Sequence, residues 1–120
     1  MADVLPDTDV FIDHLRGAQR LHEGSDTIHY SVVTRAELFA GRGAEESRVA
    51  LLLAPFPELP VDRAVAERAG RLRRGSAIRL PDALIAATAI EHGCVLVTRN
   101  VRDFKDIPHL RVRQPRAQAR

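Results

Sequence analysis

Residues 80–104 read LPDALIAATAIEHGCVLVTRNVRDF, a stretch that predicts a helix, a turn and a strand in that order. Pro81 suits the first turn of a helix, where its missing N–H removes no hydrogen bond, and Gly93 suits the turn that ends one. The short apolar run at residues 95–97 is bounded by polar residues, as expected for a strand. A helix that leads directly into an apolar strand is typical of proteins with a parallel sheet.

The same alternation extends over the rest of the chain. Strands are predicted at residues 4–6, 28–31, 58–61 and 95–97, with a weaker one at 110–112. Helices are predicted at residues 9–16, 34–41, 45–53, 62–74 and 81–92, and Thr34 is the expected cap of the second. We therefore expect an α/β fold of three layers, with a central, mostly parallel sheet of four to five strands between helices.

Length and composition limit the possible classes of protein. The 120 residues, 45% of them hydrophobic, suffice for one domain, which we expect to span residues 1–113 and to be followed by a flexible tail at 114–120. The 18 basic and 16 acidic residues give a net charge of only +2. Cys94 is the single cysteine, and no segment resembles a signal peptide or a membrane span, which favours a cytoplasmic location. No glycine-rich phosphate loop is present, so no nucleotide cofactor is expected.

Four acidic residues lie beside predicted strand ends or helix starts: Asp7, Glu37, Asp82 and Asp103. Ligands of parallel sheets bind at the carboxyl ends of the strands, where these side chains can meet. Carboxylates crowded into one pocket repel each other unless a cation is present. Each close pair costs about 4 kcal/mol in a medium of intermediate polarity. A fold that gathers these acids is therefore expected to bind a divalent metal.

Three segments resemble a known family in their order and spacing. DTDVFID at residues 7–13, SVVTRAELFAG at 31–41 and the opening stretch at 80–104 are similar to the PIN-domain ribonucleases, and more narrowly to the VapC toxins of toxin–antitoxin pairs. The resemblance covers residues 4–112. It implies an endoribonuclease dependent on Mg²⁺ or Mn²⁺ that hydrolyses phosphodiester bonds in RNA. It also implies a cognate VapB-like antitoxin that neutralises the activity, and a homodimer.

The resemblance also implies which acids form the site. The family's first three acids fall on Asp7, Glu37 and Asp82. The fourth position stays open, because the usual acid two residues after Thr98 is Asn100 here, while Asp103 matches a second acid that many members carry. Asp7 and Asp82 are expected to bind metal directly, and Glu37 to bind a second ion or to orient the attacking water.

Polar neighbours of these acids are assigned supporting roles. The hydroxyls of Thr8 and Thr98 and the side chain of Asn100 are expected to position waters or phosphate oxygens. Arg99 and Arg102, which flank Asn100, are candidates for contact with RNA.

Each acid also has a purely structural interpretation. Asp7 can cap the helix that follows it, and Glu37 can be half of a capping box. Asp82 can complement a helix dipole, and Asp103 can stabilise its own loop. The metal site is favoured because all four acids fit one site together. No catalytic role is assigned to Asp9, Asp13 and Asp106.

Two other functions fit parts of the sequence. A non-catalytic PIN module that binds RNA or protein is favoured by Asn100 at an acidic position, and it would leave RNA intact. A phosphatase with an aspartate nucleophile would use the segment from Asp7 to Asp9, but Phe11 does not fit its motif and Lys105, the single lysine, has no acidic pair after it. RNA cleavage that tolerates Asp9→Ala would identify the nuclease.

Overall fold

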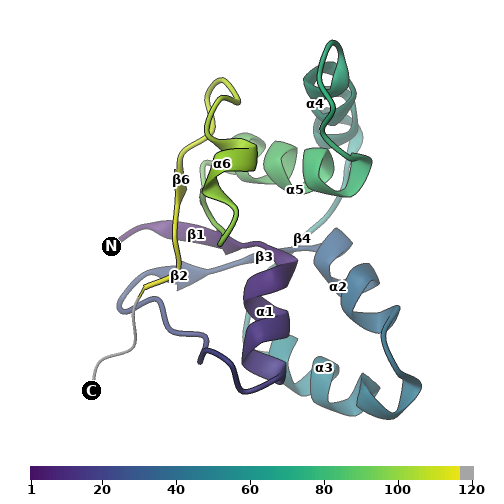
Figure 1. Cartoon of the computed structure of the whole chain (residues 1–120), viewed down its shortest axis with the longest axis vertical. Helices are drawn as coiled ribbons and strands as arrows, with labels where there is room; N and C mark the ends of the chain where they lie inside the picture. The colour runs from purple at the N-terminus through teal and green to yellow at the C-terminus, as the bar shows by residue number, and fades with distance from the viewer. Residues whose placement is uncertain (117–120) are drawn as a thin grey trace.

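A four-stranded parallel sheet lies at the centre of the protein (Figure 1). The computed structural model describes residues 1–116. The strand order is β2 (Thr27–Ile28), β1 (Asp3–Pro6), β5 (Val95–Val97) and β6 (Val112–Arg113). A second parallel pair is formed by β3 (Tyr30–Ser31) and β4 (Glu58–Leu59). The helices are α1 (Thr8–Leu15), α2 (Val32–Phe39), α3 (Glu46–Leu53), α4 (Arg63–Arg73), α5 (Leu80–Glu91) and α6 (Val101–Phe104), with a 3-10 turn at Gly43–Glu45 before α3.

Helices cover both faces of the sheet because neighbouring residues of β1 point to opposite sides. Val4 packs with Val10 of α1 on one face. Leu5 packs with Ile85 of α5 and with Phe104 on the other. Full burial of such a side chain stabilises the fold by about 1.5–3 kcal/mol. The three-layer α/β fold with a central parallel sheet is therefore confirmed.

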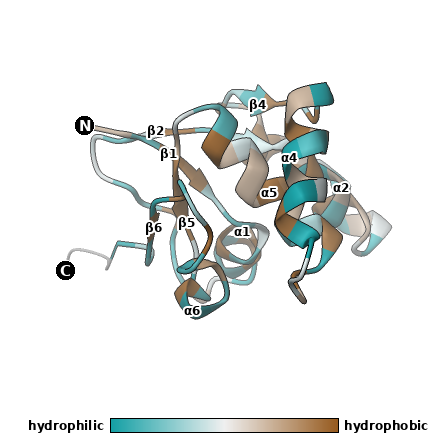
Figure 2. Ribbon diagram, turned by 90° about the horizontal axis from the view of Figure 1, so that it is seen from above, coloured by the Kyte–Doolittle hydropathy of each residue, from teal (hydrophilic) through white to brown (hydrophobic). Residues whose placement is uncertain are grey.

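The interior helix α5 connects the sheet to α4. Its residues Ile85 and Ala86 pack toward the strands, while Ala83 and Ala87 pack against Val65 and Ala69 of α4. In Figure 2, α5 lies between the strands and α4 and carries mainly hydrophobic residues. Alanines on both sides of this contact let the two helices pack closely.

The strand predicted at residues 28–31 is wrong as a single element, because it is divided at His29. The His29 N–H donates to the Val4 carbonyl at 2.9 Å, as part of the main sheet. The Tyr30 N–H instead donates to the Pro57 carbonyl at 3.1 Å, next to β4. The chain therefore changes partner within one residue, which yields two short strands.

Two other details differ from the prediction. Ser31 caps α2, because its Oγ accepts the Val33 N–H at 3.1 Å, and Thr34 is buried inside the helix. The segment 101–104, predicted as loop, forms the single turn α6.

Residue Arg116 pairs with Asp26 at 3.1 Å. The rest of the predicted tail, 117–120, lies outside the described residues. None of the helices in residues 1–116 has the length and hydropathy needed to cross a membrane.

Candidate functional site

The four acids selected from the sequence line one pocket of about 470 Å³. Asp7 follows β1 directly, Glu37 lies on α2, Asp82 is in the first turn of α5 and Asp103 is in α6. β1 and β5 are parallel neighbours, so their carboxyl ends reach the same edge of the sheet. The pocket forms where this edge meets α2 and the start of α5.

Asp7 is buried and held by hydrogen bonds on both carboxylate oxygens. Only 5% of the residue is exposed. Its Oδ1 accepts the Thr8 N–H at 2.7 Å, and its Oδ2 accepts the Thr98 hydroxyl at 3.0 Å. Asp7 is thus the N-cap of α1 and a wall of the pocket at once, so its structural and functional interpretations do not exclude each other.

The pKa of Asp7 is raised to about 6. Burial is the largest cause, and the negative charges of Asp9 and Asp82 add to it. The hydrogen bonds from Thr98 and from the Thr8 backbone act in the opposite direction. Burial and the neighbouring acids therefore destabilise the ionised form of Asp7, and a nearby cation would stabilise it.

A chain of hydroxyl groups connects the interior to Glu37. The Thr8 hydroxyl donates to Glu37 Oε1 at 2.6 Å and lies 2.9 Å from the Thr34 hydroxyl. Because Thr8 has a single hydroxyl proton and donates it to Glu37, Thr34 must be the donor to Thr8. Thr34 lies inside α2, which Ser31 caps, so Thr34 and Glu37 form no capping box. The hydrogen bond from Thr8 orients the Glu37 carboxylate from within the fold.

Asp82 is half-buried and faces other acids. Burial raises its pKa, and Glu37, Asp9 and Asp103 raise it further, while Arg79 lowers it. Glu37 of α2, Asp82 of α5 and Asp103 of α6 all line the pocket. Arg79, immediately before α5, also lines the pocket.

Asn100 belongs to the same pocket through two hydrogen bonds. Its N–H donates to the Thr98 hydroxyl oxygen at 3.0 Å, and its side-chain Nδ2 donates to Asp9 Oδ2 at 3.2 Å. Asn100 and Asp103 both line the pocket, so either residue can take the place of the family's fourth acid.

The two arginines beside Asn100 do not line the pocket. Arg99 pairs with Asp13 at 3.0 Å and lies 3.7 Å from Asp9, which directs it toward α1. Arg102 is exposed on α6. Their contact with RNA stays a prediction.

The chain is similar to known proteins over most of its length. The model of the PIN domain matches residues 4–110 of the chain. The chain belongs to the PIN-domain family. It is 41% identical over 113 residues to Ribonuclease VapC10 of Mycobacterium tuberculosis, with 84% of this chain and 85% of that protein covered. It is 38% identical over 122 residues to Ribonuclease VapC19 of the same organism, with 88% and 95% covered.

A solved structure supports the same assignment for this PIN domain. A chain of a toxin–antitoxin complex from Klebsiella pneumoniae superimposes with a TM-score of 0.75 at 31% identity. The match covers 97% of this chain and 100% of that one. The resemblance to PIN-domain and VapC proteins is therefore confirmed, and it leaves no support for the phosphatase interpretation.

The donor groups of this PIN domain fit a hard divalent cation. The acids lining the pocket are Asp7, Asp9, Glu37, Asp82 and Asp103, and Arg79 is the basic residue among the lining. Among residues 1–116, no three His, Cys, Asp or Glu side chains form a ready-made metal site. Mg²⁺ keeps several waters and uses one or two carboxylates, so a pocket of spaced oxygen donors suits it better than a closed cage.

Two charged residues of the pocket, Asp9 and Arg79, are not among the site residues predicted from the sequence. Asp9, to which the sequence assigns no catalytic role, lines the pocket and accepts a hydrogen bond from Asn100. Its charge also raises the pKa of Asp7 and of Asp82. Its position two residues after Asp7, in the first turn of a helix, is the available signal. For Arg79 the available signal is that it directly precedes the helix that carries Asp82.

Proposed function

We propose that this PIN domain is a divalent-metal-dependent endoribonuclease, the toxin of a pair whose second member is a VapB-like antitoxin. The proposal is supported by relatives that are named ribonucleases and by likeness to a chain of a toxin–antitoxin complex. The observation that carries it is the convergence of acids from four helices on one pocket. The homodimer and the cytoplasmic location stay predictions of the sequence.

The metal would be held by Asp7 and Asp82, with Glu37 available to a second ion or to the attacking water. Bound there, Mg²⁺ or Mn²⁺ would acidify a coordinated water and neutralise charge on the phosphate under attack. The raised pKa of Asp7 and of Asp82 supports this choice, because both groups gain most from a neighbouring positive charge.

The other residues orient these acids. Thr98 and the Thr8 N–H hold both oxygens of Asp7, so that carboxylate cannot rotate freely. The Thr8 hydroxyl fixes Glu37, which can then accept a proton from a water in the pocket. Arg79 lies beside Asp82 and offers a guanidinium to a phosphate oxygen.

RNA cleavage by purified protein, free of antitoxin, tests the proposal. Structured RNA should be cut in Mg²⁺ or Mn²⁺ and left intact in EDTA, and Asp7→Asn should reduce the rate by at least about a hundredfold. Asp62→Asn is the matched control, because Asp62 caps α4 and does not line the pocket. Intact RNA with the wild type, or equal cleavage by Asp7→Asn, would favour the non-catalytic binding module.

A further inference from the structure

Two acids of α1 bind the turn that connects β5 to α6. Asp9 and Asp13 are four residues apart, so their side chains lie on the same face of the helix. Arg99 Nε lies 3.0 Å from Asp13 Oδ2, and Arg99 Nη2 lies 3.7 Å from Asp9 Oδ2. The next residue, Asn100, donates from Nδ2 to Asp9 Oδ2 at 3.2 Å. One face of α1 therefore holds two consecutive residues of the turn.

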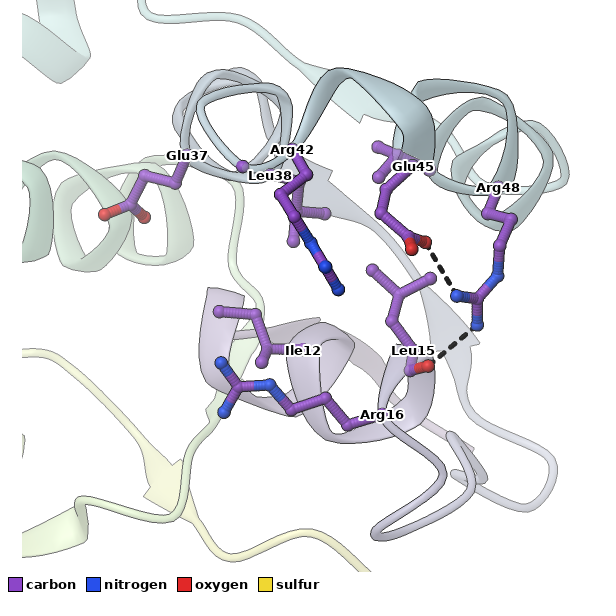
Figure 3. Close-up of a pocket in the computed structure, with 10 residues that line it drawn as sticks. Ile12, Leu15, Arg16, Glu37, Leu38, Arg42, Glu45 and Arg48 are labelled. Atoms are coloured by element: carbon purple, nitrogen blue, oxygen red, sulfur yellow. Dashed lines mark hydrogen bonds and ion pairs between the residues drawn. The ribbon is translucent and has the colours of Figure 1, made fainter.

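A different side of α1 packs against its neighbouring helices. Figure 3 shows Ile12 and Leu15 on that side, facing α2 and the start of α3, with Leu38 of α2 nearby. The side chains of Asp9 and Asp13 are directed to the turn after β5 instead. The helix is therefore fixed by apolar contacts on one side and binds the turn through charged groups on another.

The position of Asn100 is not determined by its own helix. Asn100 is the N-cap of α6, yet its side chain makes no capping hydrogen bond. Asparagine is favoured at an N-cap because its side-chain oxygen can accept a backbone N–H of the first turn. Here the side chain is bound to Asp9, and the Asn100 N–H donates to the Thr98 hydroxyl. The Asn100 carbonyl in turn accepts the Asp103 N–H at 3.0 Å, so contacts outside α6 place both pocket residues.

Burial and charge favour an internal role for Arg99. The Asp13 side chain is only 15% exposed, whereas that of Arg99 is 50% exposed. Without Arg99, the largely buried Asp13 carboxylate would lose its cation. Asp9 and Asp13 would then repel each other, because like charges four residues apart destabilise a helix. Arg99 does not line the acidic pocket, so to reach a phosphate there it would have to leave both acids.

We propose that Asp13 and Arg99 are positioning residues of the nuclease, and that their ion pair clamps the β5–α6 turn to α1 so that Asn100 and Asp103 stay at the pocket. This inference rests on the proposed function. It gives Asp13 a role, and it makes Arg99 a strut inside the fold in place of a contact with RNA. Thr98 holds the same turn from the sheet, so the turn is fixed from two directions.

Cleavage kinetics test the clamp. Asp13→Asn and Arg99→Gln should each lower kcat about tenfold and change KM less than about twofold, because they displace pocket residues without removing an RNA contact. The double variant should be no slower than either single variant, since all three lack the same interaction. Arg99→Lys keeps the charge and should retain most of the wild-type kcat. Asp106→Asn and Arg63→Gln are the matched controls, because both residues are exposed and neither lines the pocket.

Hydrogen exchange tests the clamp without RNA or metal. In EDTA, the amides of residues 98–104 should exchange about fivefold faster in Asp13→Asn and in Arg99→Gln than in the wild type. The amides of α4 should exchange at the wild-type rate, which shows that the effect is local. Circular dichroism verifies that each variant is folded.

Three results would overturn the inference. A raised KM with unchanged kcat in Arg99→Gln, while Asp13→Asn cuts normally, would make Arg99 a contact with RNA. Wild-type kcat and wild-type exchange in both variants, with cleavage by the wild type, would overturn the clamp and leave the proposed function standing. Absence of cleavage by the wild type would overturn the proposed function and the positioning role together, whatever the exchange rates.

Discussion

Thr98 donates a hydrogen bond from its hydroxyl to Asp7 Oδ2 at 3.0 Å, although the two residues are 91 positions apart in the sequence. The same hydroxyl oxygen accepts the Asn100 N–H at 3.0 Å. One threonine at the end of β5 therefore orients the carboxylate at the end of β1 and the turn that carries Asn100. Thr98 is fully buried, so water cannot replace either bond.

Removing that hydroxyl should shift the pH dependence of RNA cleavage. Thr98→Val deletes the hydrogen bond that holds the pKa of Asp7 down, so this pKa should rise further above about 6. The acidic limb of the pH–rate profile should then move to higher pH. Thr98→Ser keeps the hydroxyl and should retain the wild-type profile. Coinciding profiles for the valine and serine variants would show that Thr98 does not act on Asp7.

Asp7→Asn should make the protein more stable at pH 7 while it abolishes cleavage. The pKa of Asp7 is raised from 3.8 to about 6, so the folded chain binds this proton more tightly than the unfolded chain. Its contribution to stability is greatest below pH 3.8 and is lost as the pH rises through about 6. At 1.36 kcal/mol per pKa unit the gain at pH 7 is at most about 3 kcal/mol. Urea unfolding at pH 7 and pH 4 measures it, and the gain should vanish at pH 4.

Divalent metal should stabilise the folded wild type. A cation that binds only the folded chain adds about 2.7 kcal/mol at a concentration a hundredfold above its Kd. Mn²⁺ or Mg²⁺ at pH 7.5 should therefore raise Tm, and EDTA should reverse the change. Below pH 6, protonation of Asp7 competes with the metal and the rise should shrink. An equal rise in Asp7→Asn would place the cation elsewhere.

Asp62→Ala should destabilise the fold and leave RNA cleavage unchanged, which is the reverse of what Asp7→Asn should do. Asp62 Oδ1 accepts the Val65 N–H at 2.9 Å and caps α4. Loss of this cap should cost about 1 kcal/mol in the free energy of unfolding. The cleavage rate per folded molecule should not change, because Asp62 does not line the pocket. A large loss of kcat would mean that α4 positions α5 more tightly than its packing indicates.

The alternation of strands and helices could be predicted because each long element has a clear local pattern. β5 lies at the residues predicted, and α5 begins with Pro81 in its first turn and ends before Gly93. The division at His29 could not be predicted, because it depends on two different backbone partners, Val4 and Pro57, which only the folded chain brings near. Thr34 has the right spacing for a cap, but it is used by a long-range contact with Thr8.

The sequence predicts those residues of the candidate site whose place is set by the strand or helix beside them. Asp7, Asp82 and Asp103 stand beside a strand end or a helix start, and the parallel sheet brings those points to one edge, whereas Glu37 reaches the pocket from the last turn of α2. Whether Asp9 and Arg79 reach the pocket depends instead on which side of their own segment faces it. The hydrogen bond from Thr8 to Glu37 joins α1 to α2 and has no signature in either segment alone.

The sheet order also determines when the acidic pocket can exist. β1 is synthesised before its neighbour β5, and β2, β3 and β4 are made between them. A nascent chain that stops short of residue 98 leaves Asp7 without its hydroxyl partner and has neither Asn100 nor Asp103. A ribosome making this protein therefore holds an unfinished pocket until the segment from Thr98 to Asp103 has been added.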